Sequence, residues 1–95
     1  MIEGRTRTGF EFSVDEDIIR DMEFVELAAE AQDNGLLLPR LIEMVVGKEQ
    51  KKAMYDHVRN ENGRVLMEKV NAEFEDVIEA IKESPATKNS LSLPT

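Results

Sequence analysis

The feature that most constrains this chain is the segment at residues 36–47, LLLPRLIEMVVG, which is its most apolar stretch. Only Arg40 and Glu43 place charges in it, so a helix formed here is apolar on nearly every side. A helix of that kind has to be buried or paired with another element. The sequence therefore predicts a short buried helix at residues 38–46, ended by Gly47, around which the other elements pack.

Helical periodicity predicts three further helices, at about residues 15–32, 48–60 and 66–83. The last of them has the cleanest apolar stripe, which consists of Leu66, Val70, Phe74, Val77, Ile78 and Ile81. At the start of the first, Ser13 and Glu16 have the spacing of a capping box. The expected fold is thus mainly α, with about four helices.

The N-terminal region has a different period. Residues 8–14 alternate between apolar and polar side chains, which is typical of a strand. Because a lone strand is unstable, this strand is expected either to pair with residues 2–6 in a hairpin or to dock on a neighbouring chain. The second arrangement uses an exposed edge, which is a route to oligomers. The Ile-Glu-Gly-Arg run at residues 2–5 also matches a common engineered protease site and is compatible with a cloning remnant.

The C-terminal segment at residues 84–95, SPATKNSLSLPT, is rich in Ser, Pro and Thr. Its apolar content is too low for it to fold alone. A chain of 95 residues corresponds to one domain by length. The predicted organisation is a single helical domain at residues 1–83, with an N-terminal β element, followed by a flexible, disordered tail.

The charge balance argues against several partners. The chain has 20 acidic and 12 basic residues and a formal net charge of −8. Nucleic-acid binding requires clustered Lys and Arg to neutralise phosphates, so neither DNA, RNA nor an anionic membrane surface is an expected partner. There is no cysteine, which excludes disulfides and thiolate zinc sites. The apolar runs are far shorter than the roughly 20 residues that span a bilayer, and no signal-peptide pattern is present, so a soluble intracellular protein is expected.

The sequence contains no pattern typical of an enzyme. His57 is the only histidine, and it is expected to lie at the edge of the core. The carboxylates fall on predicted helix surfaces, where they are solvated, whereas general acid–base catalysis needs desolvated groups with separated pKa values. The glycines form no phosphate-binding motif. We therefore predict no catalytic residue, no cofactor and no metal site.

The helix predicted at residues 15–32 has two apolar faces. One consists of Ile18, Met22, Val25 and Ala29, and the other of Phe24, Leu27, Ala28 and Ala31. The first is expected to face the core. The second either packs on another element or marks a contact with a partner or a second subunit. The residues predicted to make such contacts are Phe24, Leu27, Leu36, Leu37, Leu41 and Met44.

Several motifs occur in an order that is informative about function. Residues 6–15 read TRTGFEFSVD and precede an acidic amphipathic helix, and residues 45–50 read VVGKEQ. An NGRV turn follows at residues 62–65, and the last helix begins EKVNAEF at residues 68–74. In this order and spacing, and over nearly its whole length, the chain resembles the small tail assembly chaperones of long-tailed (siphovirus-type) bacteriophages and prophages, the counterparts of the lambda G protein.

That resemblance implies a non-enzymatic role in the cytoplasm of the bacterial host. Such chaperones bind the tape measure protein, a long helical chain, and keep it soluble until tail tube protein polymerises around it. A longer form made by a programmed frameshift recruits the tube protein. Residues 87–89, Thr-Lys-Asn, can be encoded by an A-rich slippery heptamer. The resemblance also implies self-association into a homo-oligomer.

The acidity of the chain supports an alternative function. A protein of net charge −8 could act as an acidic regulator that mimics DNA or inhibits a basic partner. Binding of that kind is sensitive to salt, whereas binding of an apolar cargo should tolerate it.

Overall fold

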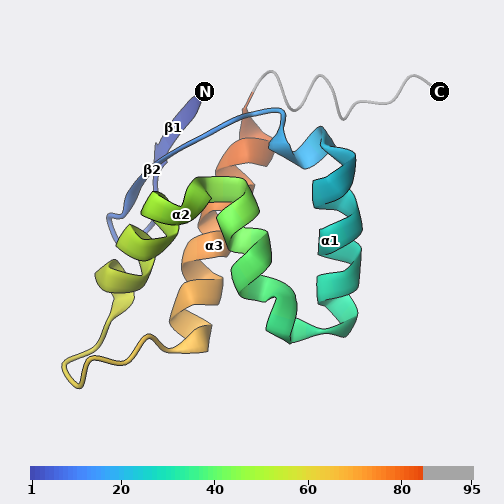
Figure 1. Cartoon of the computed structure of the whole chain (residues 1–95). Helices are drawn as coiled ribbons and strands as arrows, with labels where there is room; N and C mark the ends of the chain where they lie inside the picture. Colours follow the sequence, from blue (N-terminus) through green and yellow to red (C-terminus); the bar gives the residue numbers. More distant parts are fainter. Residues whose placement is uncertain (85–95) are drawn as a thin grey trace.

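The computed structural model describes residues 1–84 and begins with a two-stranded antiparallel hairpin (Figure 1). Strand β1 spans Ile2–Arg5 and strand β2 spans Glu11–Val14. The register pairs Ile2 with Val14 and Arg5 with Glu11. The hairpin alternative is therefore confirmed, and residues 2–5 form an integral strand of the domain.

A close contact inside the hairpin explains the glycine in β1. Gly4 lies opposite Phe12, and a Cβ atom added at Gly4 would come within 2.6 Å of the Phe12 ring. The ring therefore occupies the space that a side chain at position 4 would need. Phe12 and Val14 face inward and are almost fully buried, as the alternating pattern predicted.

The first α-helix, α1, spans Met22–Asp33 and is preceded by the single 3₁₀ turn η1 at Ile18–Arg20. The predicted start near residue 15 is wrong, and so is the predicted capping box. Ser13 belongs to β2, and the cap is Asp21, whose Oδ1 accepts hydrogen bonds from the backbone N–H groups of Glu23 and Phe24 at 2.8 and 3.4 Å. The intervening residues turn the chain from the strand into the helix.

The face of α1 that packs on the rest of the domain is also the opposite of the one expected. Met22 and Val25 are exposed, whereas Leu27 is buried. Phe24, Ala28 and Ala31 are partly buried against the core. The two apolar faces were equally compatible with helical periodicity, and the face containing Leu27 is the one that contacts α2.

The apolar segment forms the short turn η2 at Gly35–Leu37 and the first half of α2, which spans Leu38–Val58. Residues 1–84 thus form three α-helices rather than the four predicted, because the helices expected at residues 38–46 and 48–60 are joined. They meet at a sharp bend at Gly47, whose φ of 84° and ψ of 165° are not helical. Figure 1 shows the two halves of α2 running in different directions.

The last helix, α3, spans Met67–Glu83, close to the predicted bounds. Its apolar stripe is confirmed at Val70, Phe74, Val77 and Ile81, which are buried, while Ile78 is partly buried and Leu66 is exposed. The buried residues of the stripe join residues from the hairpin, α1 and α2 in one core. The buried apolar residues of that core are Phe10, Phe12, Val14, Leu27, Leu41, Ile42, Val45, Val46, Met54, Val70, Phe74, Val77 and Ile81. The segment predicted to be a flexible tail lies, from residue 85 onward, outside the described residues.

The bend in α2 yields a test of the fold. The φ and ψ of Gly47 fall in a region that is essentially restricted to glycine. No atom lies within 4 Å of a Cβ added there, so only backbone strain opposes a side chain. Gly47→Ala should therefore lower the free energy of unfolding by about 1–3 kcal/mol, measured by urea denaturation. Gly35→Ala is the control, because Gly35 has equally open space and no positive φ. An equal effect of the two substitutions would contradict the assigned bend.

Candidate interaction surface

A buried carboxylate, Glu73, joins the hairpin loop to α3. It is only 2% exposed. The Thr6 hydroxyl donates to its Oε1 and the Thr8 hydroxyl to its Oε2, both at 2.7 Å. The Thr6 oxygen also accepts a hydrogen bond from the backbone N–H of Phe10 at 3.0 Å. Both carboxylate oxygens therefore have donors, which is what a buried charge requires.

His57 stands at the end of this network. Its Nε2 lies 3.0 Å from the Thr8 hydroxyl oxygen, and its ring centre is 5.6 Å from that of Phe10. Since the Thr8 hydroxyl donates to Glu73, its oxygen can accept a hydrogen bond from Nε2–H of the histidine. In a nucleophile–base–acid relay the histidine lies between hydroxyl and carboxylate. Here the hydroxyl lies between the other two groups, so the arrangement holds the loop in place and does not activate the threonine.

A second, solvent-exposed contact holds the same loop on α3. The Arg7 Nη2 donates to Asp76 Oδ1 at 2.7 Å, and the Arg7 backbone N–H donates to Asp76 Oδ2 at 2.9 Å. The side-chain hydrogen bond from Arg7, reinforced by the backbone one, lowers the pKa of Asp76 below its ordinary value. The same pairing raises the pKa of Arg7. Sequence patterns did not single out Glu73 or Asp76, which look like two more acidic residues on a helix.

An apolar groove of about 280 Å³ lies where the start of α2 meets the start of α3. Its lining residues are Gly35, Leu36, Leu38, Pro39, Tyr55, Val65, Met67 and Val70. Leu36 is 88% exposed and Met67 is 68% exposed, which is unusual for large apolar side chains. Its volume is just below the range of about 300–1,000 Å³ typical of small-molecule pockets, and suits one or two side chains of a partner.

The structure places some of the residues predicted to contact a partner on the surface and others in the core. Leu36 lines the groove and is fully accessible. Phe24, Leu37 and Met44 are partly buried against the core. Leu27 and Leu41 are 7% and 8% exposed and cannot reach a partner while the domain is folded. They are core residues of this chain, and we do not include them in the interaction surface.

Sequence reasoning missed the other groove residues. Tyr55 comes from the second half of α2, which reaches the groove only because the helix bends at Gly47. Val65 and Met67 come from the connection before α3 and the first residue of that helix. No sequence periodicity links these positions to Leu36. Leu66, which helical periodicity assigned to the core stripe, is 37% exposed.

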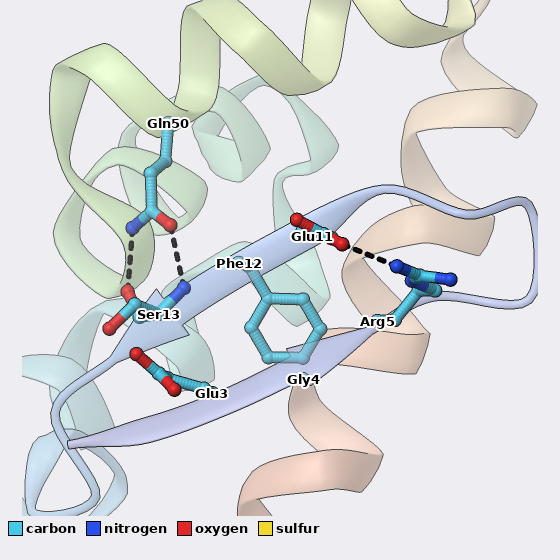
Figure 2. A pocket seen from close by; sticks show the side chains of 7 residues that line it. All are labelled: Glu3, Gly4, Arg5, Glu11, Phe12, Ser13 and Gln50. Carbon is cyan, nitrogen blue, oxygen red and sulfur yellow. Dashed lines mark hydrogen bonds and ion pairs between the residues drawn. The ribbon is translucent and has the colours of Figure 1, made fainter.

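A larger concavity of about 620 Å³ covers the outer face of the hairpin (Figure 2). Its side chains are mostly polar, and two interactions already use them. Arg5 forms an ion pair with Glu11 across the strands, and the Gln50 side chain bonds to the backbone of Ser13. This face therefore differs in chemistry from the apolar groove.

No protein-family model, no curated protein and no solved structure matches this chain. Within residues 1–84, no helix is both long and apolar enough to cross a membrane. The same residues contain no group of three or more His, Cys, Asp or Glu side chains that could hold a metal ion.

The buried network predicts a difference between two similar substitutions. Thr6→Val keeps the shape of the side chain but removes the hydroxyl that serves both Glu73 and the N–H of Phe10. Leaving buried groups without partners should lower the free energy of unfolding by about 1–3 kcal/mol. Thr8→Val is the comparison, because it removes one hydrogen bond to Glu73, whereas Thr6→Val removes two hydrogen bonds, so the loss should be smaller. Urea denaturation of both variants measures this, and a larger loss in Thr8→Val would contradict the network described.

The Arg7–Asp76 contact predicts a pH dependence. The folded state lowers the pKa of Asp76. The contact therefore stabilises the fold fully at a pH above the pKa of an aspartate in the unfolded chain, about 3.9. This stabilisation is lost as the pH falls through the lower pKa of the folded state. Asp76→Asn should thus be less stable than the wild type at pH 7, with the difference shrinking at acid pH. Urea denaturation between pH 7 and pH 2 measures it.

Asp56→Asn is the control for this experiment. Its pKa is also lowered, by a hydrogen bond from Arg59 three residues away, but this ion pair is exposed and local and should contribute little to stability. A constant difference between wild type and Asp76→Asn at every pH would contradict the role given to the carboxylate.

Proposed function

We propose that this chain is a tail assembly chaperone of a siphovirus-type phage or prophage, which acts by binding an apolar helical segment of the tape measure protein. The proposal is supported by the sequence resemblance and, in the structure, chiefly by the exposed apolar groove that contains Leu36 and Met67. In this function the protein is not an enzyme and works in the cytoplasm of the bacterial host. A longer frameshifted form would recruit the tail tube protein.

The groove fits a helix as the occupant. An amphipathic helix binds an apolar groove through side chains spaced three and four residues apart. The two exposed apolar residues, Leu36 and Met67, belong to different elements and line the same groove, so one helix face can contact both. Methionine adapts to differently shaped partners, which suits a chaperone whose cargo is a long chain with many apolar segments.

The charge of the chain also suits this role. A net charge of −8 keeps a protein soluble and opposes non-specific association. The groove lining contains no acidic residue. An apolar cargo bound there would be carried by a strongly charged particle, and that would keep the complex in solution.

One observation favours the second candidate, an acidic regulator that mimics DNA or inhibits a basic partner. The solvent-facing side of α3 displays a row of exposed carboxylates, which consists of Glu68, Glu75, Glu79 and Glu83. A basic protein could bind this row. Such binding would be weakened strongly by salt, whereas contact through the apolar groove would not.

The groove is tested by co-expression with the tape measure protein of the same genome, followed by affinity purification at low and high salt. The wild type should keep the tape measure protein soluble and co-purify with it at both salt concentrations. Leu36→Asp combined with Met67→Asp should abolish co-purification and leave the helical circular dichroism signal unchanged, because both side chains are exposed.

The control places the same charges on another exposed apolar pair. Met22 and Val25 lie on the outer face of α1 and outside the groove, so Met22→Asp combined with Val25→Asp should still co-purify. Equal loss in both double variants would show that the groove is not the site. Failure of the wild type to bind would overturn the chaperone function, and binding that is lost at high salt would favour the acidic regulator.

A further inference from the structure

The two edges of the hairpin differ in how their backbone groups are paired. The Thr6 N–H donates to the Phe10 carbonyl at 2.9 Å, so these two residues form a hydrogen-bonded pair. Bonded and non-bonded pairs alternate along an antiparallel ladder. With the observed register, the N–H and C=O groups of Ser13 point away from β1, and those of Glu3 and Arg5 point away from β2.

The outer edge of β2 is occupied by a side chain. The backbone N–H of Ser13 donates to Gln50 Oε1, and Gln50 Nε2 donates to the Ser13 carbonyl, both at 2.7 Å (Figure 2). The amide also donates to the Val46 carbonyl at 2.7 Å, which fixes it to α2. A helix side chain thus takes the place of a neighbouring strand, and this protects the edge from further pairing.

The outer edge of β1 has no such cover. Among residues 1–84, no hydrogen bond is made to the outward N–H or C=O groups of Glu3 or Arg5. Both side chains are exposed, and Glu3 forms no ion pair within the same residues. Helix α3 contacts β1 and lies behind it in Figure 2, so the outer face that carries Glu3 and Arg5 points away from this helix. An unpaired strand edge is a template for another strand.

We propose that the β1 edge binds the β1 edge of a second copy of this chain, antiparallel, with Gly4 opposite Gly4 across a two-fold axis. In this register Glu3 lies opposite Arg5 of the second copy, and Arg5 lies opposite its Glu3. These are the residues whose N–H and C=O groups point outward, so both pairs can form two backbone hydrogen bonds each. The two hairpins become one four-stranded sheet.

The charges on the outer face select this register. Directly opposed cross-strand pairs of opposite charge stabilise a sheet, and like charges destabilise it. Across the joined sheet the row reads Glu11, Arg5, then Glu3 of the second copy, so each arginine lies between two carboxylates. A shift by two residues in one direction opposes Glu3 to Glu3, and a shift in the other direction opposes Arg5 to Arg5. A shift by one residue would exchange the inner and outer faces.

The size of this contact sets the expected strength. An edge of four residues buries much less than the roughly 1,200 Å² of the smallest stable specific interfaces. The dimer should therefore be reversible and depend on concentration, with the average mass in sedimentation equilibrium rising toward twice that of the chain. The experiment uses the isolated protein and needs no tape measure protein, so its outcome is independent of the proposed function.

The decisive test uses two charge reversals, Glu3→Arg and Arg5→Glu. Each variant alone places like charges opposite each other at both cross-strand pairs and should lose self-association. Mixed in equal amounts, they form a heterodimer in which every pair is complementary again, so the average mass should rise on mixing. Arg5→Glu also places a carboxylate opposite Glu11 within the hairpin, and like charges in that position destabilise a sheet. Circular dichroism therefore has to show that each variant is folded before its self-association is compared with that of the wild type.

The control pair carries the same charge changes on other exposed positions. Glu26→Arg and Arg64→Glu alter residues of α1 and of the loop before α3, both exposed. Each should self-associate like the wild type, and mixing them should produce no further increase in mass. If the controls behave like the edge variants, net charge and not the β1 edge governs association, and the proposal is wrong.

A third variant tests the backbone pairing without changing the register of the hairpin. Glu3→Pro removes an N–H that points away from β2, and proline is tolerated on a strand edge for this reason. The variant should keep its helical signal and lose the dimer. A wild type that stays monomeric at all concentrations, or a Glu3→Pro variant that dimerises like the wild type, would overturn the proposal.

Discussion

The domain depends on the burial of one carboxylate. Glu73 lies in the middle of α3, where an apolar residue would be expected, and the hairpin loop supplies the two hydroxyl groups that make its burial possible. Without Thr6 and Thr8 the buried carboxylate would lack hydrogen-bond partners, and without the carboxylate the loop would be held on α3 only through Arg7 and Asp76. Because Phe10 follows the loop directly and enters the core, this polar contact also determines how the hairpin packs.

The elements with a single strong signal were predictable from the sequence. The stripe of α3, the alternation in β2 and the glycine at position 47 each led to the observed structure, although the helices on either side of Gly47 form one bent element. Helix α1 was predicted less well because its two apolar faces have the same period, and only the neighbour α2 decides between them. Its start was misplaced because Asp21 and Ser13 are equally good capping residues, and a strand had already used Ser13.

The interaction surface was predictable only in part, for a different reason. Leu36 is apolar and exposed, and sequence reasoning identified it because it lies beside the most apolar helix. Leu27 and Leu41 carry the same signal but are buried, since hydrophobicity alone does not distinguish a core residue from a contact residue. Tyr55 and Met67 became neighbours of Leu36 through the bend at Gly47 and the return of the chain into α3, and such proximity is a property of the tertiary structure.

The contact between the hairpin loop and α3 joins residues 67 positions apart, from Thr6 to Glu73. During translation the hairpin leaves the ribosome before α3, the helix that completes its core and carries the partners of its loop. Contacts of such long sequence separation form late and slow folding. Until α3 has emerged, Phe10 and Phe12 lack the cover that this helix provides in the core. The nascent chain thus passes through a state that is more prone to association than the finished domain, and completion of α3 ends that exposure.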